Sequence, residues 1–198
     1  MKMFQEGSEY WVPYFKKEDM ESVFNEVYEK KKWGSFAGGS GDGSLPEYAN
    51  HFRNILSNLI TNNNIETVVD FGCGSWEVYK DYKWPQVDYT GIDIADIPLK
   101  KAKKNCSIDS FKFIKETDYN NIPSADLLIV KEVFQHWPDE HITDFFENNK
   151  SKFKYIYVVG EVKFTLPLEI EKMASYAILH KHEKPNKEHL TNGYWIFK

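Results

Sequence analysis

Apolar residues recur along this chain in two rhythms, one typical of helices and one typical of buried strands. Spacings of three and four predict helices over residues 17–32 and 46–61, and shorter helices over 95–105 and from Pro138 onward. Short, nearly continuous apolar runs predict buried strands over residues 67–71, 89–94, 111–115, 126–131 and 155–160. Because strands and helices alternate, the sequence predicts an α/β fold with a doubly wound, mostly parallel sheet.

The last part of the chain departs from this alternation. After a short predicted helix over residues 168–174, strand-like segments at 176–180 and 193–197 flank a turn-rich stretch around Pro185. These two strands predict an antiparallel hairpin at the edge of the sheet. We expect a single domain over residues 1–198, in which 1–45 form an arm, a helix and a glycine-rich cap loop and 46–198 form the core.

Two closely spaced glycines, Gly72 and Gly74, break the first predicted strand just after Asp70. Glycine permits a sharp turn and lets bare peptide N–H groups come close to a ligand. A dinucleotide site also needs a third glycine at the start of the next helix, where a phosphate binds. Here Trp76 and Glu77 follow instead, on a segment predicted to be a short helix to about residue 82. The turn therefore predicts a nucleotide-type cofactor without a phosphate and disfavours a nicotinamide-linked dehydrogenase.

Charged residues stand at the ends of the next predicted strands: Asp93, Asp118 and the neighbours Lys131 and Glu132. In open α/β sheets, ligands bind outside the carboxyl ends of the strands. Asp93 follows the glycine turn by about 20 residues, the spacing at which an acid reaches ribose hydroxyls. A single aspartate at a strand end more often caps a turn or a helix. Their occurrence on consecutive strands nevertheless predicts one ligand site.

Composition and charge narrow the possible partners. The net charge of −5 argues against a surface that binds nucleic acid. No apolar run is long enough for a membrane span, and the N-terminal residues lack the apolar core of a signal peptide. With only Cys73 and Cys106 present, we expect a reducing compartment and a cytoplasmic location. The six histidines show no metal-ligand spacing, so no metal site is predicted.

Aromatic residues make up 16% of the chain, which allows two interpretations. The rings could line a ligand pocket, or they could simply fill a small core, which is the commoner outcome.

These segments resemble the class I S-adenosylmethionine-dependent methyltransferases. The resemblance rests on residues 68–74, 90–94 and 126–138, and it extends over roughly residues 65–160. The pair Trp33-Gly34 and the Ser-Gly-x-Gly-Ser loop at 40–44 are similar to those of a subgroup with an N-terminal helix. The resemblance implies a Rossmann-like, three-layer α/β/α fold with S-adenosylmethionine as cofactor and S-adenosylhomocysteine as product. Trp76 departs from the family, in which a third glycine is commoner.

The resemblance also implies roles for individual residues. Asp70 and the backbone of residues 72–74 would hold the methionine end of the cofactor. Asp93 would accept hydrogen bonds from the ribose hydroxyls, and Asp118 and Tyr119 would lie at the adenine. The backbone carbonyl of Lys131 would accept from the cofactor amine, and the segments 33–34 and 40–44 would close over it. The ring of Trp33 or Trp76 would lie beside the sulfonium, although packing in the core is the commoner role of such a ring. The implied cofactor-binding residues are Trp33, Gly34, Ser40, Gly41, Asp70, Gly72, Gly74, Trp76, Asp93, Ile94, Asp118, Tyr119 and Lys131.

The leading prediction is an enzyme that O-methylates a small molecule or a saccharide or glycan precursor. Such an acceptor needs alignment with the methyl group and a base to take its proton. His136 is the first candidate base and Glu132 the second, although His136 could instead cap or pack against the following helix. Alternatives are an RNA or protein methyltransferase and a non-catalytic cofactor-binding partner subunit. The sequence leaves open whether the protein is a monomer or a homodimer.

Overall fold

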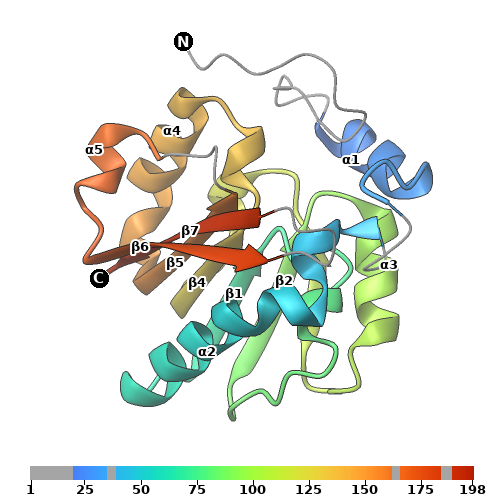
Figure 1. Ribbon diagram of the computed structural model, residues 1–198, viewed down its shortest axis with the longest axis horizontal. Coiled ribbons are helices and arrows are strands. Elements are labelled where there is room, and N and C mark those ends of the chain that lie inside the picture. Colours follow the sequence, from blue (N-terminus) through green and yellow to red (C-terminus); the bar gives the residue numbers. More distant parts are fainter. Residues whose placement is uncertain (1–19, 35–38, 162–165, 184–188) are drawn as a thin grey trace.

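The computed structural model describes residues 20–34, 39–161, 166–183 and 189–198 (Figure 1). A single seven-stranded sheet forms the centre, with the strand order β3-β2-β1-β4-β5-β7-β6. The strands are β1 (Thr67–Phe71), β2 (Asp88–Asp93), β3 (Lys112–Lys115), β4 (Ala125–Lys131), β5 (Phe153–Glu161), β6 (Tyr176–Glu183) and β7 (His189–Phe197). The α-helices are α1 (Met20–Glu29), α2 (Pro46–Asn62), α3 (Asp96–Asn105), α4 (Asp139–Asn149) and α5 (Leu168–Glu171). Short 3-10 turns are η3 (Asp42–Ser44), η4 (Glu77–Tyr79), η5 (Tyr119–Asn121), η6 (Phe134–His136) and η7 (Lys150–Lys152).

The pairing of the strands confirms the predicted topology. Strand β1 runs parallel to both β2 and β4, and the pairs β2–β3 and β4–β5 are also parallel. Strand β7 runs antiparallel to β5 and to β6, so the C-terminal hairpin lies at one edge of the sheet. The chain reverses its direction of winding between β1 and β4. The carboxyl end of β1, where the two glycines follow, is therefore the topological switch point at which ligands bind in such sheets.

Helices cover both faces of the sheet and make three layers (Figure 1). Successive residues of a strand point to opposite faces, and β1 shows the result. Val68 packs into a core cluster with residues of α2 and α3, whereas Val69 and Phe71 pack into a second cluster with residues of α4 and α5. Apolar side chains on both faces explain why the strands read as continuous apolar runs.

Several predicted boundaries were wrong, each for a local reason. The helix expected after the glycine turn is only the single turn η4, because Trp76 adopts a left-handed conformation with φ 63°. Strand β6 continues through Glu183, which the sequence placed in a turn, because residues 176–183 pair with β7 along their whole length. The predicted hairpin turn at 184–188 and the N-terminal arm at 1–19 lie outside the described residues.

Most aromatic rings of the described residues are buried in the core, as the commoner interpretation of the composition expects. One group packs ring against ring on the α2 face of the sheet: Trp76, Tyr79, Trp84, Tyr89, Phe111 and Phe113. A second group packs on the α4 face: Phe71, Tyr119, Phe134, Trp137, Phe145 and Phe146. Among the helices of the described part of the chain, none is long and apolar enough to cross a membrane.

Candidate active site

The turn after β1 can be built only with glycine at two positions. Gly72 and Gly74 have φ values of 78° and 57°, in the left-handed region that side chains avoid. A Cβ atom on Gly72 would lie 2.2 Å from Cγ2 of Val133, and one on Gly74 would lie 2.8 Å from the hydroxyl oxygen of Tyr28. Both glycines therefore serve close packing as well as the turn itself.

The amides of this turn already have acceptors within the protein. Gly72 and Cys73 both donate to the carbonyl oxygen of Ile92, at 2.8 and 2.9 Å, and Gly74 donates to Asp93. The next amide, of Ser75, donates to the side chain of Ser40 at 3.2 Å. The expectation of bare N–H groups is therefore wrong, because the end of β2 lies against the turn and uses them. A turn without spare donors does not suit a phosphate.

Asp93 joins β2 to the glycine turn. Its Oδ2 accepts from the Gly74 amide at 2.9 Å and its Oδ1 accepts from the Ala95 amide at 2.9 Å. Burial raises the pKa of Asp93 to about 6, although these backbone hydrogen bonds act in the opposite direction. A carboxylate has about four acceptor positions, so it can also accept from hydroxyl groups of a ligand.

A cavity of about 50 Å³ opens beside Asp93, over the carboxyl ends of β1, β2 and β3. Among the predicted cofactor-binding residues, Gly72, Asp93, Ile94 and Tyr119 line it. Apolar side chains make most of its wall, and Asp93 and Glu116 are its two carboxylates. Its other lining residues are Met20, Phe24, Phe71, Thr117, Val133 and Trp137. Flat rings and carboxylates are groups that recognise a nucleoside with free hydroxyl groups, and a volume of about 50 Å³ holds only part of such a ligand.

The predicted adenine residues divide into one that lines the cavity and one that does not. Tyr119 lines it, and its hydroxyl donates to Asp144 of α4. Asp118 uses Oδ1 to accept from the Asn120 amide at 3.0 Å and so caps η5, the commoner role of an aspartate after a strand. Its neighbours Glu116 and Thr117 line the cavity instead. The sequence analysis did not single out these two residues, although they directly follow a predicted strand.

Two other predicted cofactor residues point into the core. The Asp70 carboxylate lies on the α2 face of β1 and accepts from the Tyr89 hydroxyl at 2.7 Å; burial raises its pKa to about 6. The ring of Trp76 is buried in the same aromatic group, in contact with Tyr79 and Tyr89. Neither side chain lines the cavity, and the burial of Trp76 agrees with core packing, the commoner of the two roles predicted for its ring.

The segment before α2 lies over the glycine turn, near where the sequence placed it. Ser40 is its main contact, with its hydroxyl 2.7 Å from that of Ser75 and 3.0 Å from that of Tyr28. Gly41 has a φ of 82° and lies beside Trp33, and Gly34 also has a positive φ. Residues 35–38 lie outside the described part of the chain. Tyr28 was not predicted, because its helical spacing marked it only as part of an apolar face.

His136 packs among rings of the N-terminal segment. Its imidazole stacks on Trp33, with ring centroids 5.4 Å apart and planes 17° apart, and meets Phe24 edge-on at 5.8 Å. Burial lowers the pKa of His136 to about 4, and the nearby charge of Glu132 opposes this change. The imidazole is therefore neutral at neutral pH and is a weak base. Its ring contacts are with Phe24 and Trp33 of the N-terminal segment, and not with the following helix as the alternative prediction had it.

Lys131 and Glu132 end β4 with an ion pair, 2.7 Å from Nζ to Oε1. Glu132 has a φ of 58°, which is unusual for a residue with a side chain. Its carboxylate lies against the backbone of Gly43 in η3, where a Cβ atom would be 2.5 Å from Oε1. The two candidate bases therefore differ: His136 is packed among rings, whereas Glu132 belongs to a charged pair.

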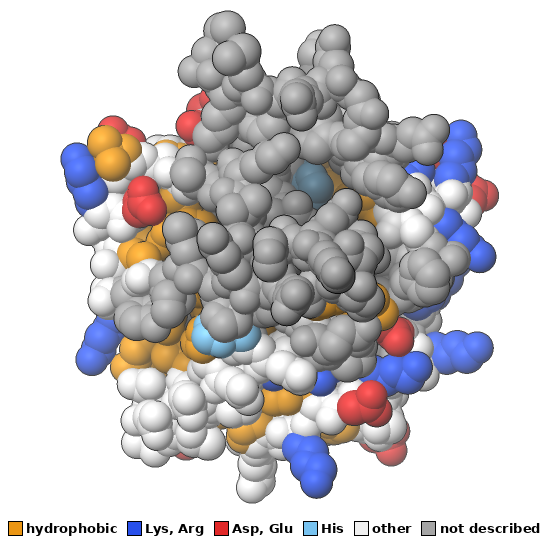
Figure 2. Space-filling view, in the orientation of Figure 1, with side chains coloured by type: hydrophobic (Ala, Val, Ile, Leu, Met, Phe, Trp, Pro, Cys, Tyr) orange, Lys and Arg blue, Asp and Glu red, His pale blue; other side chains and the backbone are white. Residues whose placement is uncertain are grey.

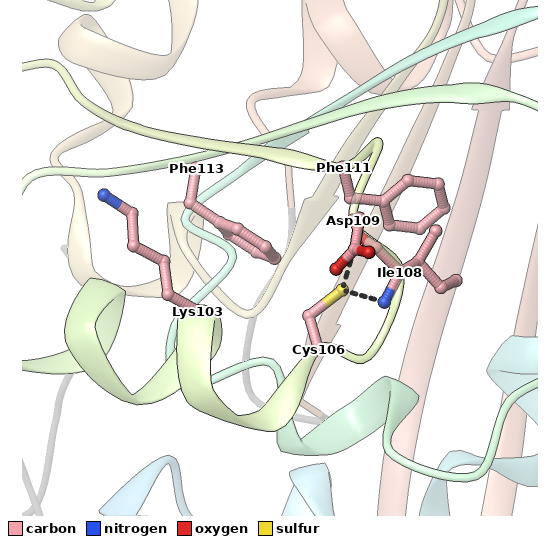
Figure 3. Close-up of a pocket in the computed structure, with 6 residues that line it drawn as sticks. All are labelled: Lys103, Cys106, Ile108, Asp109, Phe111 and Phe113. Carbon is pink, nitrogen blue, oxygen red and sulfur yellow. Dashed lines mark hydrogen bonds between the residues drawn. The ribbon is translucent and has the colours of Figure 1, made fainter.

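A second hollow, of about 180 Å³, lies at the end of α3 and the start of β3 (Figure 3). Its only thiol, that of Cys106, makes long contacts with the backbone of Ile108, at 3.5 Å to the nitrogen and 3.7 Å to the oxygen. We assign it no role. Within the described ranges, no group of three His, Cys, Asp or Glu side chains is arranged to hold a metal ion.

Comparisons with solved structures identify the fold. One similar structure is the magnesium protoporphyrin IX methyltransferase of Synechocystis PCC 6803 with bound S-adenosylmethionine, which is 14% identical over 92% of this chain and 97% of that chain, with a TM-score of 0.67. Another is an N-methyltransferase of Bradyrhizobium japonicum WM9 with S-adenosylhomocysteine, 12% identical over 87% and 97%, with a TM-score of 0.63. A third is a putative RNA methyltransferase of Pyrococcus horikoshii, 16% identical over 76% and 80%, with a TM-score of 0.57.

Comparisons of sequence identify the family. No curated protein matches this sequence significantly. Residues 50–163, more than half of the chain, match a family model described as an O-methyltransferase domain. The matched region runs from α2 to the end of β5 and includes the glycine turn, Asp93 and the Lys131–Glu132 pair. This protein belongs to the O-methyltransferase domain family.

Proposed function

We propose that this protein transfers a methyl group from S-adenosylmethionine to a hydroxyl group of a small molecule or of a saccharide precursor. The observation that best supports this cofactor is the contact between the glycine turn and Asp93, 2.9 Å from the Gly74 amide. In this contact the Gly74 amide donates to Asp93, so the amide cannot bind a phosphate. The buried carboxylate of Asp93 can still accept from ribose hydroxyls. Two similar proteins of known structure hold S-adenosylmethionine or S-adenosylhomocysteine.

The residues around the cavity fit this cofactor. Asp93 would accept from the ribose hydroxyls, and the rings of Tyr119 and Trp137 would pack against the adenine. The Lys131 carbonyl would accept from the amino group, and Ser40 and its neighbours would cover the methionine end. When bound, S-adenosylmethionine supplies a methyl group already activated by a positively charged sulfur. The protein then needs chiefly to align the acceptor and to accept its proton.

The match to an O-methyltransferase family supports a hydroxyl group as the acceptor. The net charge of the protein supports a small molecule over a nucleic acid. The net charge of −5 disfavours RNA, whose binding depends on basic side chains. On the face seen in Figure 2, Lys and Arg side chains are spread around the rim with Asp and Glu side chains among them. A saccharide is favoured by the resemblance of the Trp33-Gly34 pair and the 40–44 loop to one methyltransferase subgroup.

The test is transfer of a labelled methyl group from S-adenosylmethionine to the small-molecule fraction of a cell extract, followed by mass spectrometry. We expect a labelled methyl ether with the parent protein and none with Asp93→Ala. Asp96→Ala is the matched control, because this exposed acid lies three positions further on and pairs with Lys115 on the surface. Label in RNA or protein alone, or equal transfer by Asp93→Ala, would contradict the proposal.

A further inference from the structure

The ion pair between Lys131 and Glu132 lies at the same edge of the sheet as the proposed cofactor site. It lies at the carboxyl end of β4, next to the switch point between β1 and β4. Its side chains are only 9% and 15% exposed. On the other side, Nζ of Lys131 lies 6.0 Å from the centre of the Phe52 ring of α2. The pair is thus enclosed between the sheet and α2.

This ion pair costs free energy of folding, so a contribution to stability does not explain it. Glu132 holds a left-handed φ of 58°, and its amide donates to the Val159 carbonyl at 2.7 Å, so the strained backbone is fixed in place. Glycine would adopt the same conformation freely. Buried ion pairs also add little to stability, because removing two charges from water offsets their attraction. Strained residues of this kind occur chiefly where they serve function.

The surroundings of Glu132 also indicate a functional group. Its carboxylate fits against Gly43, the one residue type that leaves room for it there. Its charge reaches side chains from three other elements. Burial raises the pKa of Tyr28 in α1 and of Tyr194 in β7, and the Glu132 charge adds to both increases. In His136 of η6 the same charge opposes the effect of burial. The charge of Glu132 therefore acts on side chains of α1, β7 and η6, although the charge of Asp93 acts more strongly on Tyr28.

We propose that Lys131 and Glu132 act together on the acceptor and select a hydroxyl group rather than a protonated amine. A hydroxyl is both a donor and an acceptor, so it can donate to the Glu132 carboxylate and accept from the Lys131 ammonium. A protonated amine has donors only and would be repelled by the ammonium group 2.7 Å away from the carboxylate. This inference rests on the proposed function and assigns to Glu132, rather than His136, the role of base.

The proton and electron balance of this step is simple. The acceptor O–H bond breaks, its proton passes to Glu132, and its electron pair stays on the oxygen beside the Lys131 ammonium. That oxygen forms the new bond to the methyl carbon, while the electrons of the old carbon–sulfur bond remain on the leaving sulfur. Glu132 then releases its proton to water. No oxidant, reductant or metal ion is required.

Two variants separate this role from a structural one. Glu132→Gln removes the charge and keeps the shape, whereas the double variant Lys131→Met with Glu132→Gly removes the pair and relieves the backbone. Both keep the Lys131 carbonyl. We expect each to lower turnover by at least about 100-fold, the usual contribution of a base. Because the Lys131 carbonyl is kept, the affinity of both variants for S-adenosylhomocysteine should stay within about threefold of the parent value. The double variant should unfold at the same temperature as the parent protein or at a higher one.

The matched control removes an exposed ion pair of the same chemistry, Lys30→Met with Glu26→Gln, and should keep parent turnover. Acceptor probes are matched alcohols and alkyl amines that are protonated at neutral pH, cyclohexanol with cyclohexylamine and benzyl alcohol with benzylamine, together with the extract fraction. The inference would be overturned if the double variant kept nearly the turnover of the parent or unfolded at a lower temperature than the parent. A preference of the parent protein for the amines would also overturn it. Failure of the parent to bind S-adenosylhomocysteine would instead overturn the proposed function.

Discussion

Gly72→Ala tests whether the glycine turn is fixed by backbone conformation, by close packing, or by both. Gly72 has a φ of 78°, and a Cβ atom there would lie 2.2 Å from Cγ2 of Val133. The left-handed conformation costs a residue with a side chain roughly 1–2 kcal/mol. Overpacking of a close contact costs about 1–3 kcal/mol more. We therefore expect Gly72→Ala to lower the free energy of unfolding by roughly 2–4 kcal/mol, after a small offset from the less flexible unfolded chain.

Val133→Ala makes this prediction sharper, because it removes the atom that the new Cβ would meet. In the Val133→Ala background, adding Gly72→Ala should cost only the conformational part, roughly 1–2 kcal/mol. The four proteins form a double-mutant cycle that urea unfolding can measure. A coupling of about 1–3 kcal/mol is expected between the two positions. If Gly72→Ala costs the same with Val133 and with Ala at 133, the contact is not the reason for glycine.

Two further predictions concern titration. Trp33→Ala should raise the pKa of His136 from about 4 towards its ordinary value of 6.5, because the stacked Trp33 ring contributes to the burial of the imidazole. An NMR titration of His136 would measure this change, and an unchanged pKa would contradict the prediction. Burial raises the pKa of Asp70 from 3.8 to about 6, so the folded state binds this proton more tightly than the unfolded state does. The free energy of unfolding should therefore fall as pH rises from about 4 to about 6. Asp70→Asn should remove up to roughly 3 kcal/mol of that fall in urea titrations, and a parallel pH dependence of the two proteins would contradict the assignment.

The fold could be predicted because its signals are local and repeated. Each buried strand is a short apolar run, and each helix shows its own spacing, so errors at boundaries did not change the topology. Errors arose where long-range pairing decides the outcome. Glu183 reads as part of a turn, yet it pairs with His189 in β7, and no pattern within either segment reports this partner.

The site could be predicted only as far as strand ends determine it. The position of Asp93 could be predicted because it ends a strand, and Asp93 lines the cavity there; its role in binding ribose stays a prediction. The sequence left two roles open for the Trp76 ring, because it does not show the left-handed backbone at this residue; in the structure the ring lies in the core. Tyr28 was missed because its contact with Ser40 joins α1 to a loop that only folding brings together. Contacts between separate segments were the part that local patterns could not predict.

The most direct test of the central claim is calorimetric titration of the parent protein and Asp93→Ala with S-adenosylhomocysteine, with Asp96→Ala as control. We predict one site in the parent and in the control, and a loss of affinity of at least about tenfold in Asp93→Ala, equivalent to about 1.4 kcal/mol. Thermal unfolding of all three proteins should show that Asp93→Ala remains folded at the titration temperature. Absence of binding to the parent, or equal affinity in folded Asp93→Ala, would contradict the account.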